Sequence, residues 1–343
     1  MIHRTPEIQQ SSWRAELASV VTDPAQLLDI LDLPRALLPA ALKAHALFPL
    51  RVPKSYLSRI KRGDAHDPLL RQILPLGAEA AFSPGFSEDP VGDLAAHVAL
   101  GVLHKYEGRV LLTATGACAV HCRYCFRRHF PYAEANAARD QWREALAYVA
   151  SDPTIGEVIL SGGDPLTLSD DKLMRFVTEL RAIPHVRRLR LHTRVPVVIP
   201  SRVDDALLGW LRGAGVSVAM VLHINHAQEV DWGVQEACGR LRGAGVTLLN
   251  QAVLLGGVND HPDTLAALSE RLFDVGVLPY YLHMLDRVQG AAHFAVDEAR
   301  ATELMGALRD RLPGYLVPRL VREVAGAPAK IPVVAFGAAA HCG

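Results

Sequence analysis

The sequence predicts an α/β fold in which a mainly parallel sheet is covered by helices. Between about Gly108 and Met284, short apolar runs rich in Val, Leu and Ile alternate with longer segments of helical period. The apolar runs are nearly continuous, which is typical of strands that are buried on both faces of a parallel sheet. Several of the helical segments end at a glycine, the residue preferred just past a helix C-terminus.

Six strand–helix units account for this region. The predicted strands are Arg109–Thr115, Glu157–Ser161, Arg188–Thr193, Val216–His223, Val246–Val253 and Leu278–Met284. The predicted crossover helices are Ala138–Ala150, Asp171–Ala182, Asp204–Gly213, Val234–Gly243 and Pro262–Val275. Six units can form a partial TIM-like barrel, with the chemistry at the C-terminal ends of the strands. An open doubly wound sheet has the same pattern and remains an alternative.

The two ends of the chain differ from this core. The first hundred residues are predicted to be helical and to pack on the core, because residues 21–33 and 67–74 are amphipathic. The last thirty or so residues are predicted to form a loop and a short strand. We therefore divide the chain into an N-terminal helical region (1–100), a barrel core (101–295) and a C-terminal segment (296–343).

Composition points to small-molecule partners. Lys plus Arg equals Asp plus Glu at 36 each, so the overall charge offers no support for nucleic-acid binding. No apolar stretch reaches the roughly 20 residues of a membrane span, and residues 1–17 lack the apolar core of a secretory signal. Five cysteines, three of them within eight positions, favour a metal or cluster site in a reducing cytoplasm. Cys238 is predicted to lie in a helix core and Cys342 in the tail.

The strongest motif is Cys118-x3-Cys122-x2-Cys125, directly after the first core strand. Three thiolates on one tight loop can hold three irons of a cubane cluster and leave the fourth open for an exogenous ligand. A zinc site would need a fourth ligand, which His121 or His129 would have to supply. Three unrelated core cysteines are a further alternative. Ligand count and spacing favour the open cluster.

Other polar residues lie at predicted strand ends. Ser161–Leu166 reads SGGDPL, and its paired glycines would allow the backbone to approach a ligand closely. By itself this motif is equally compatible with an ordinary turn between strand and helix. His223, Asn225 and Gln251 also fall at strand ends. Spacing alone would make Lys330 a solvated surface residue.

The cysteine motif resembles that of the radical S-adenosylmethionine (SAM) superfamily, and the surrounding CRYCFRRHFPY resembles the lysine 2,3-aminomutase family. The chain is most similar to the shorter branch of that family, which supplies β-lysine for modification of elongation factor P. Phrases that carry this similarity occur along nearly the whole chain: PGFSEDP, SGGDPL, INHAQEV, TLLNQAVLL, PYYLHMLDRVQGAAHF and GYLVPRLVRE. The fold implied is a partial (β/α)6 TIM-like radical SAM barrel, with an N-terminal helical extension and a C-terminal segment that carries a cofactor lysine.

The resemblance implies transfer of the amino group of lysine from C2 to C3, with a [4Fe-4S] cluster, SAM and pyridoxal 5′-phosphate (PLP). The cluster would be bound by the three cysteines of the motif, and its open iron would bind the methionine part of SAM. The residues implied to contact SAM are Ser161, Gly162, Gly163, Asp164, His223 and Gln251.

Lys330, between Gly326, Pro328 and Pro332, resembles the lysine that binds PLP as a Schiff base. Lys105, Tyr106 and Arg109 match positions that hold the same cofactor. The family usually has arginine where Lys105 stands, so a phosphate contact there would be a point charge rather than a bidentate fork.

Substrate contacts follow from the same resemblance. Arg127 matches the arginine that binds the α-carboxylate, whereas Arg128 is expected to make a fold or helix-end contact. Asp286 matches one of two aspartates that bind the distal ammonium group. At the second position, seven residues before Lys330, this chain has Glu323, which keeps the charge but reaches about one methylene further. Recognition of the ammonium group is therefore expected to differ in detail.

Two other functions remain alternatives. One is an aminomutase for another amino acid such as glutamate, which Asp286 and Glu323 disfavour because they would repel a side-chain carboxylate. The other is a non-catalytic iron–sulfur or zinc protein. The expected partners are lysine, a reductant such as flavodoxin or ferredoxin, and a downstream ligase for elongation factor P. A homo-oligomer is compatible with the sequence.

Overall fold

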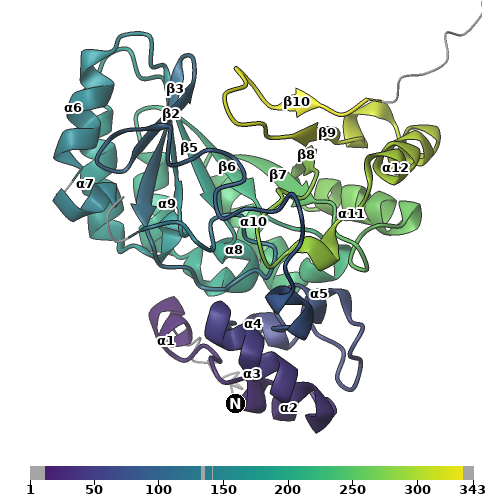
Figure 1. Cartoon of the computed structure of the whole chain (residues 1–343). Coiled ribbons are helices and arrows are strands. Elements are labelled where there is room, and N and C mark those ends of the chain that lie inside the picture. Colours follow the sequence, from purple (N-terminus) through teal and green to yellow (C-terminus); the bar gives the residue numbers. More distant parts are fainter. Residues whose placement is uncertain (1–11, 133–135, 141, 335–343) are drawn as a thin grey trace, which may run out of the picture.

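The computed structural model describes residues 12–132, 136–140 and 142–334 (Figure 1). Its described strands form one sheet in which the spatial order follows the sequence from β1 to β10. The six predicted strands are its centre and agree with the prediction to within one or two residues: β3 (Arg109–Thr115), β4 (Glu157–Gly162), β5 (Arg188–Thr193), β6 (Ser217–Leu222), β7 (Thr247–Val253) and β8 (Leu278–His283).

The direction of the strands decides the architecture. From β3 to β9 (Arg319–Arg322) every neighbouring pair is parallel. Antiparallel strands flank this set: β1 (His97–Ala99), β2 (Val102–Tyr106) and β10 (Ile331–Pro332). Because the strand order never reverses, the switch point of a doubly wound sheet is absent from the described strands, and that alternative is wrong. The sheet is an open arc, a partial barrel as predicted.

Helices follow the parallel strands in the predicted alternation (Figure 1). Five correspond to predicted crossover helices: α6 (Arg143–Ser151), α7 (Asp170–Leu180), α9 (Asp205–Arg212), α10 (Trp232–Gly243) and α11 (Pro262–Asp274). The first predicted helix is divided, because Trp142 has a left-handed φ of 70° between the short 3-10 helix Ala137–Asp140 and α6. Two helices were not predicted, the short α8 (Val195–Val198) and the 14-residue α12 (Glu298–Arg311).

Aspartate side chains start several of these helices. Asp204, Asp231 and Asp297 precede α9, α10 and α12 and accept hydrogen bonds from backbone amides three residues further on, at 2.9, 2.9 and 2.7 Å. Such capping bonds satisfy amides that have no partner within the helix. The sequence therefore fixes where these helices begin, and with that where each strand–helix loop ends.

In the N-terminal region, the predicted helical character holds for residues 13–71, whose helices lie together in the lower part of Figure 1, whereas residues 81–100 contain loops and the strand β1. Its helices are α1 (Trp13–Ala18), α2 (Pro24–Ile30), α3 (Leu38–Leu47), α4 (Lys54–Leu57) and α5 (Pro68–Arg71). Side chains such as Leu27 and Tyr56 are fully buried in the same core cluster as the barrel strands. The expected packing on the core is confirmed, whereas the division into three parts stays a prediction.

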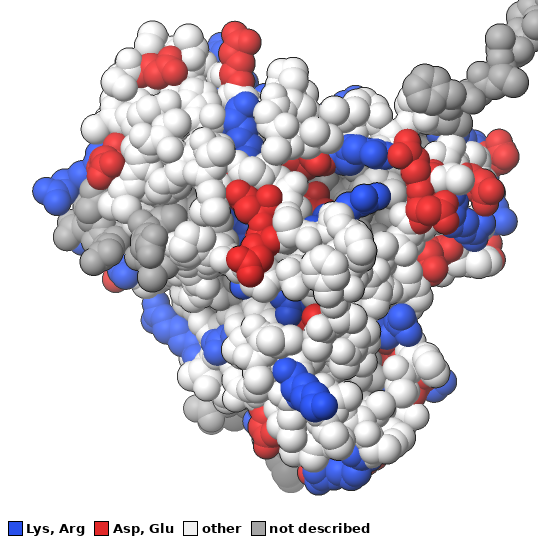
Figure 2. Space-filling model, in the orientation of Figure 1, with Lys and Arg blue, Asp and Glu red and all other residues white. Residues whose placement is uncertain are grey.

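Both acidic and basic side chains occur across the surface that Figure 2 shows, with uncharged areas between them. This pattern agrees with the equal numbers of acidic and basic residues in the sequence. None of the helices in the described ranges is both long enough and apolar enough to cross a membrane.

Candidate active site

Every site residue predicted from the sequence lines one cavity of about 510 Å³. The cavity lies at the C-terminal ends of the seven parallel strands, the edge at which barrel enzymes carry their chemistry. Each strand end or the loop after it supplies at least one lining residue: Cys118 after β3, Gly162 from β4, Thr193 from β5, His223 after β6, Gln251 from β7, Asp286 after β8 and Glu323 after β9. The topology thus brings together residues that are up to about two hundred positions apart in the sequence.

The cysteine loop is held by the N-terminal region. The Arg51 Nε donates to the carbonyl of Cys118 at 2.7 Å, and the amide of His121 donates to the carbonyl of Arg51 at 2.9 Å. The amide of Arg123 donates to the carbonyl of Gln72 at 2.9 Å. These bonds fix the loop backbone against the N-terminal region.

A buried ion pair reinforces this attachment. Arg123, between the second and third cysteines, is fully buried and donates through Nε and Nη2 to both oxygens of Glu79, at 2.8 and 2.5 Å. Arg128 donates to Glu79 as well, at 2.9 Å. The predicted fold contact of Arg128 is therefore present. Glu79 itself was not predicted, because both of its arginine partners lie more than forty residues away in the sequence.

The donor set of the loop fits a cluster. Cys118, Cys122 and Cys125 are free thiols, and burial raises the pKa of Cys118 and that of Cys125, the latter to about 11. Within the described ranges, no three His, Cys, Asp or Glu side chains converge on a point where one metal ion could bind. A cubane does not need such convergence, because each thiolate binds a different iron.

The glycines of the SGGDPL motif permit a close backbone approach. Gly162 has a φ of 107°, and a Cβ on Gly163 would lie 2.4 Å from the carbonyl oxygen of Ala117 in the cysteine loop. Glycine is required here because no side chain fits between the end of β4 and that loop. The motif therefore places the loop against β4.

Asp164 connects the ends of two neighbouring strands through hydrogen bonds. It is buried, and its carboxylate accepts hydrogen bonds from the Leu166 amide, the Thr193 hydroxyl and the Arg194 amide, at 3.0, 2.6 and 2.7 Å. These bonds link the end of β4 to the end of β5. The side chain thus shapes the cavity wall, in addition to the SAM contact that the resemblance implies.

Histidines line the cavity floor. His223 and Gln251 lie 2.7 Å apart between Nε2 atoms, so the two predicted residues act as a pair. Burial and the charge of Arg194 lower the pKa of His223 to about 3, which keeps the ring neutral. His192 and His283 also line the cavity, and the Nε2 atom of each is buried without a hydrogen-bond partner. Such atoms call for a polar ligand in the cavity.

A row of alternating charges crosses the cavity. Arg127 binds Asp93 at 2.6 Å, Asp93 binds Lys105 at 2.5 Å, Lys105 binds Glu323 at 2.9 Å, and Glu323 binds Lys330 at 2.7 Å. Two predicted functional groups, the guanidinium of Arg127 and the amine of Lys330, are thus connected through ion pairs. Asp93 is the member that the sequence analysis missed, although it lies three residues past the PGFSEDP phrase.

The two carboxylates predicted to bind the substrate ammonium group differ in charge state. Burial acts to raise the pKa of Glu323, but Lys330 and Lys105 lower it to about 2. Burial and the nearby charge of Glu323 raise the pKa of Asp286 to about 7. Glu323 is therefore ionised and already paired, whereas Asp286 titrates near neutral pH.

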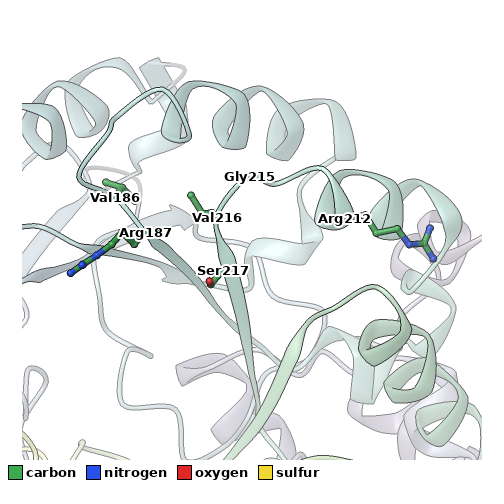
Figure 3. A pocket seen from close by; sticks show the side chains of 6 residues that line it. All are labelled: Val186, Arg187, Arg212, Gly215, Val216 and Ser217. Atoms are coloured by element: carbon green, nitrogen blue, oxygen red, sulfur yellow. The ribbon is translucent and has the colours of Figure 1, made fainter.

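A second hollow, of about 560 Å³, lies at the opposite ends of β5 and β6 (Figure 3). It is lined by Val186, Arg187, Arg212, Gly215, Val216 and Ser217. None of these side chains can act as a nucleophile activated by a base or as a soft metal ligand. The chemistry of the molecule therefore belongs to the first cavity.

Comparisons with known proteins agree with this site. Residues 112–268 match the family model of the radical SAM superfamily. The L-lysine 2,3-aminomutase of Escherichia coli K12 is 50% identical over 325 residues, which cover 94% of this chain and 95% of that protein. The L-lysine 2,3-aminomutase of Haemophilus influenzae is 45% identical, over 94% of this chain and 95% of that protein. That of Clostridium subterminale is 35% identical, over 81% of this chain and 67% of that protein. The chain belongs to the lysine 2,3-aminomutase family.

As a radical SAM lysine 2,3-aminomutase family member, the chain is an isomerase. The superfamily match supports SAM and a [4Fe-4S] cluster as cofactors. The cavity is compatible with both, since it combines three clustered thiols with buried polar atoms that lack partners.

The same cavity also has the groups that PLP would need. Lys330 supplies an amine, and the Arg109 guanidinium lies 4.6 Å from the ring of Tyr106. In the part of the chain that the structure describes, Arg109 makes no ion pair, so its charge is available for a phosphate. The Lys105 ammonium instead contacts three acceptors, on Asp93, Val91 and Glu323. Lys105 and Tyr106 lie in β2, and Arg109 begins β3.

Proposed function

We propose that this chain converts L-lysine to β-lysine by moving the amino group from C2 to C3, with PLP and a radical derived from SAM. One observation carries the proposal: the cysteine loop and Lys330, more than two hundred residues apart, lie on the wall of one cavity. The high identity to L-lysine 2,3-aminomutases over nearly the whole chain supports lysine as the substrate.

The cluster would be held by Cys118, Cys122 and Cys125. Ser161, Gly162, Gly163 and Asp164 form the neighbouring wall, and His223 with Gln251 lies beneath it. We assign these six residues to SAM. The bound cluster would supply the electron that cleaves SAM to a 5′-deoxyadenosyl radical. The chain itself contributes a shaped, mostly buried pocket that keeps water from a reactive species.

Lys330 would carry PLP, which would supply a conjugated π system that stabilises the radical while the nitrogen migrates. Glu323 holds the Lys330 amine at 2.7 Å and so orients it toward the cavity. Arg109 is the best placed cation for the cofactor phosphate, with Tyr106 beside it. Lys105 contributes indirectly, because it fixes Glu323 and Asp93.

The substrate would be held at both ends. Arg127, which also contacts the Ser161 hydroxyl at 3.2 Å, would bind the α-carboxylate as a charge-assisted pair. Asp286 would bind the distal ammonium group, with Glu323 adding negative potential nearby. Fixing both ends orients C3 toward the radical source and lowers the entropic part of the barrier.

We place the enzyme in the cytoplasm, with a flavodoxin or ferredoxin as reductant and with β-lysine passing to the ligase that modifies elongation factor P. The free cysteines among the described residues support a reducing compartment. The shorter branch is supported by sequence identity, which is 50% to the Escherichia coli relative and 35% to the clostridial one.

The proposal is tested by anaerobic reconstitution with iron and sulfide, followed by incubation with SAM, PLP, dithionite and one amino acid. We expect β-lysine from lysine and no isomer from glutamate or arginine, with the α- and β-isomers separated by chromatography. A β-isomer of glutamate, or unchanged lysine in a preparation that cleaves SAM, would refute the assigned substrate.

Two pairs of variants test which residues bind the cluster and which residue binds PLP. Cys125→Ala should lose cluster iron, whereas Cys238→Ala, which changes a buried cysteine in α10, should retain it. Lys330→Ala should keep the cluster but lose the visible absorbance of lysine-bound PLP, while Lys61→Ala, at an exposed lysine, should keep both. β-Lysine formation by Lys330→Ala at the wild-type rate would show that the role given to Lys330 is wrong.

A further inference from the structure

Arg194 contacts the cysteine loop from the side of the barrel. It is the first residue after β5, its side chain is buried, and its Nη1 donates to the Cys122 sulfur at 2.7 Å. Guanidinium groups stay protonated in proteins, so this contact places a permanent positive charge beside a thiolate of the proposed cluster.

The position of this charge is fixed by several partners. Its Nη2 donates to Glu229, Gln72 and the Tyr56 hydroxyl, at 2.8, 2.7 and 3.2 Å. Its backbone amide donates to Asp164 at 2.7 Å. A buried side chain with so many partners has little freedom to turn away from the sulfur.

Glu229 in turn is fully buried and accepts from the amide of Asn225 at 2.8 Å and from the Gln72 side chain at 3.2 Å. Its charge balances that of Arg194, which makes burial of the cation tolerable. The two partners use different nitrogens of the guanidinium: the Cys122 sulfur accepts from Nη1, whereas the Glu229 carboxylate accepts from Nη2.

A second buried arginine, which lies outside the cavity, provides a comparison for Arg194. Arg202 is also fully buried and binds Asp170 at 2.8 Å and the carbonyl of Leu166 at 2.9 Å. It does not line the cavity and donates to no cysteine. Arg194 resembles it in burial and carboxylate pairing and differs in its contact with a sulfur, so the two form a matched comparison.

We propose that Arg194 is a positioning residue that raises the reduction potential of the cluster bound by Cys118, Cys122 and Cys125. Reduction adds one electron to the cluster, and an N–H donor with a positive charge beside a ligand sulfur stabilises the reduced form more than the oxidised one. Glu229 sets the size of the effect by holding Arg194 and offsetting part of its charge. The inference rests on the proposed function, because it requires the cysteines to bind the cluster.

The test is a redox titration of the reconstituted protein, monitored by the EPR signal of the reduced cluster, with iron and sulfide content measured in each sample. Arg194→Met should lower the equilibrium constant for reduction at least tenfold, a shift of about 59 mV to more negative potential for a one-electron couple. Glu229→Gln should shift the potential in the positive direction. Arg202→Met should leave it unchanged while it lowers the unfolding midpoint.

A wild-type potential in Arg194→Met that has full iron content would overturn the inference. If Arg194→Met does not assemble the cluster, the reduction potentials of Arg194→Lys and Glu229→Gln test the inference instead. Lysine keeps the positive charge but lacks the forked guanidinium, so we expect a smaller shift to negative potential in Arg194→Lys. Wild-type potentials in both would equally refute the role. Failure of the wild-type protein to bind a cluster would instead refute the proposed function.

Discussion

Asp286 and Glu323 occupy positions with the same expected role, yet their surroundings give them opposite protonation behaviour. Glu323 lies between two lysines, which lower its pKa to about 2, so it is ionised near neutral pH. Asp286 is buried beside that negative charge, so its pKa lies at about 7. A cationic substrate would favour the ionised form of Asp286, and binding would release a proton in samples below neutral pH.

The KM for lysine should therefore fall as pH rises from about 6 to about 8, through the pKa of Asp286. Asp286→Asn should abolish this dependence and raise KM about thirty-fold or more, since losing one partner of a buried charge pair costs about 2 kcal/mol or more. Steady-state kinetics at several pH values measure both effects. Asp274→Asn, at an exposed acid in α11, is the control and should behave as wild type. An unchanged KM and slope in Asp286→Asn would exclude it from ammonium recognition.

The sequence was sufficient to predict those residues whose position depends on neighbouring parts of the chain. The cysteine motif and SGGDPL follow directly after strands, so their place at the barrel edge could be inferred from the sequence. Asp93, Glu79 and Arg194 were missed because their partners are distant: Asp93 binds Arg127 34 positions away, and Lys105 in the same row binds Glu323 218 positions away. Such pairs become visible only when the strands are assembled.

Among the elements, the central strands were predicted almost to the residue because each is a compact apolar run. Helix α12 was missed although Ala301, Leu304, Met305 and Leu308 are buried at helical spacing. Six of its fourteen residues are charged, which masks this pattern. The outer strands β2 and β9, each next to an edge strand, are short and only partly buried, so they lack the apolar signal of the central strands.

The contact between β4 and the cysteine loop leads to a prediction at this scale. Gly163→Ala should displace the loop, because its Cβ would lie 2.4 Å from backbone, and should reduce bound iron and stability by about 1–3 kcal/mol. Gly239→Ala in α10, where a Cβ meets nothing within 4 Å, should keep the iron and add up to about 1 kcal/mol. Iron analysis and urea unfolding measure these effects. Wild-type iron content in Gly163→Ala would contradict the tight approach.

Over the whole molecule, the N-terminal helices and the barrel share one continuous core, which includes residues from Trp13 to Val333. The cavity walls depend on this union, because the cysteine loop is held by the N-terminal region on one side and by β4 on the other. We therefore expect the two regions to lose structure together.

Circular dichroism and tryptophan fluorescence should accordingly report the same urea midpoint. Leu28→Ala, at a fully buried position in α2, should shift both probes together by about 2–5 kcal/mol, although it is far from the barrel strands in sequence. Leu42→Ala, at a half-exposed position in α3, should change either probe little. Separate transitions for the two probes would show that the N-terminal region unfolds independently.

The agreement between strand order and chain order also bears on how the protein is made. On the ribosome, each new strand can add to the edge left by the one before it, and no later segment must be inserted between earlier strands. The iron-binding loop and the helices that brace it emerge early, whereas the lysine that would carry the vitamin B6 cofactor emerges after nearly all of the sheet. Nascent chains stalled before β9 would therefore contain the three clustered thiols but not the Lys330 amine.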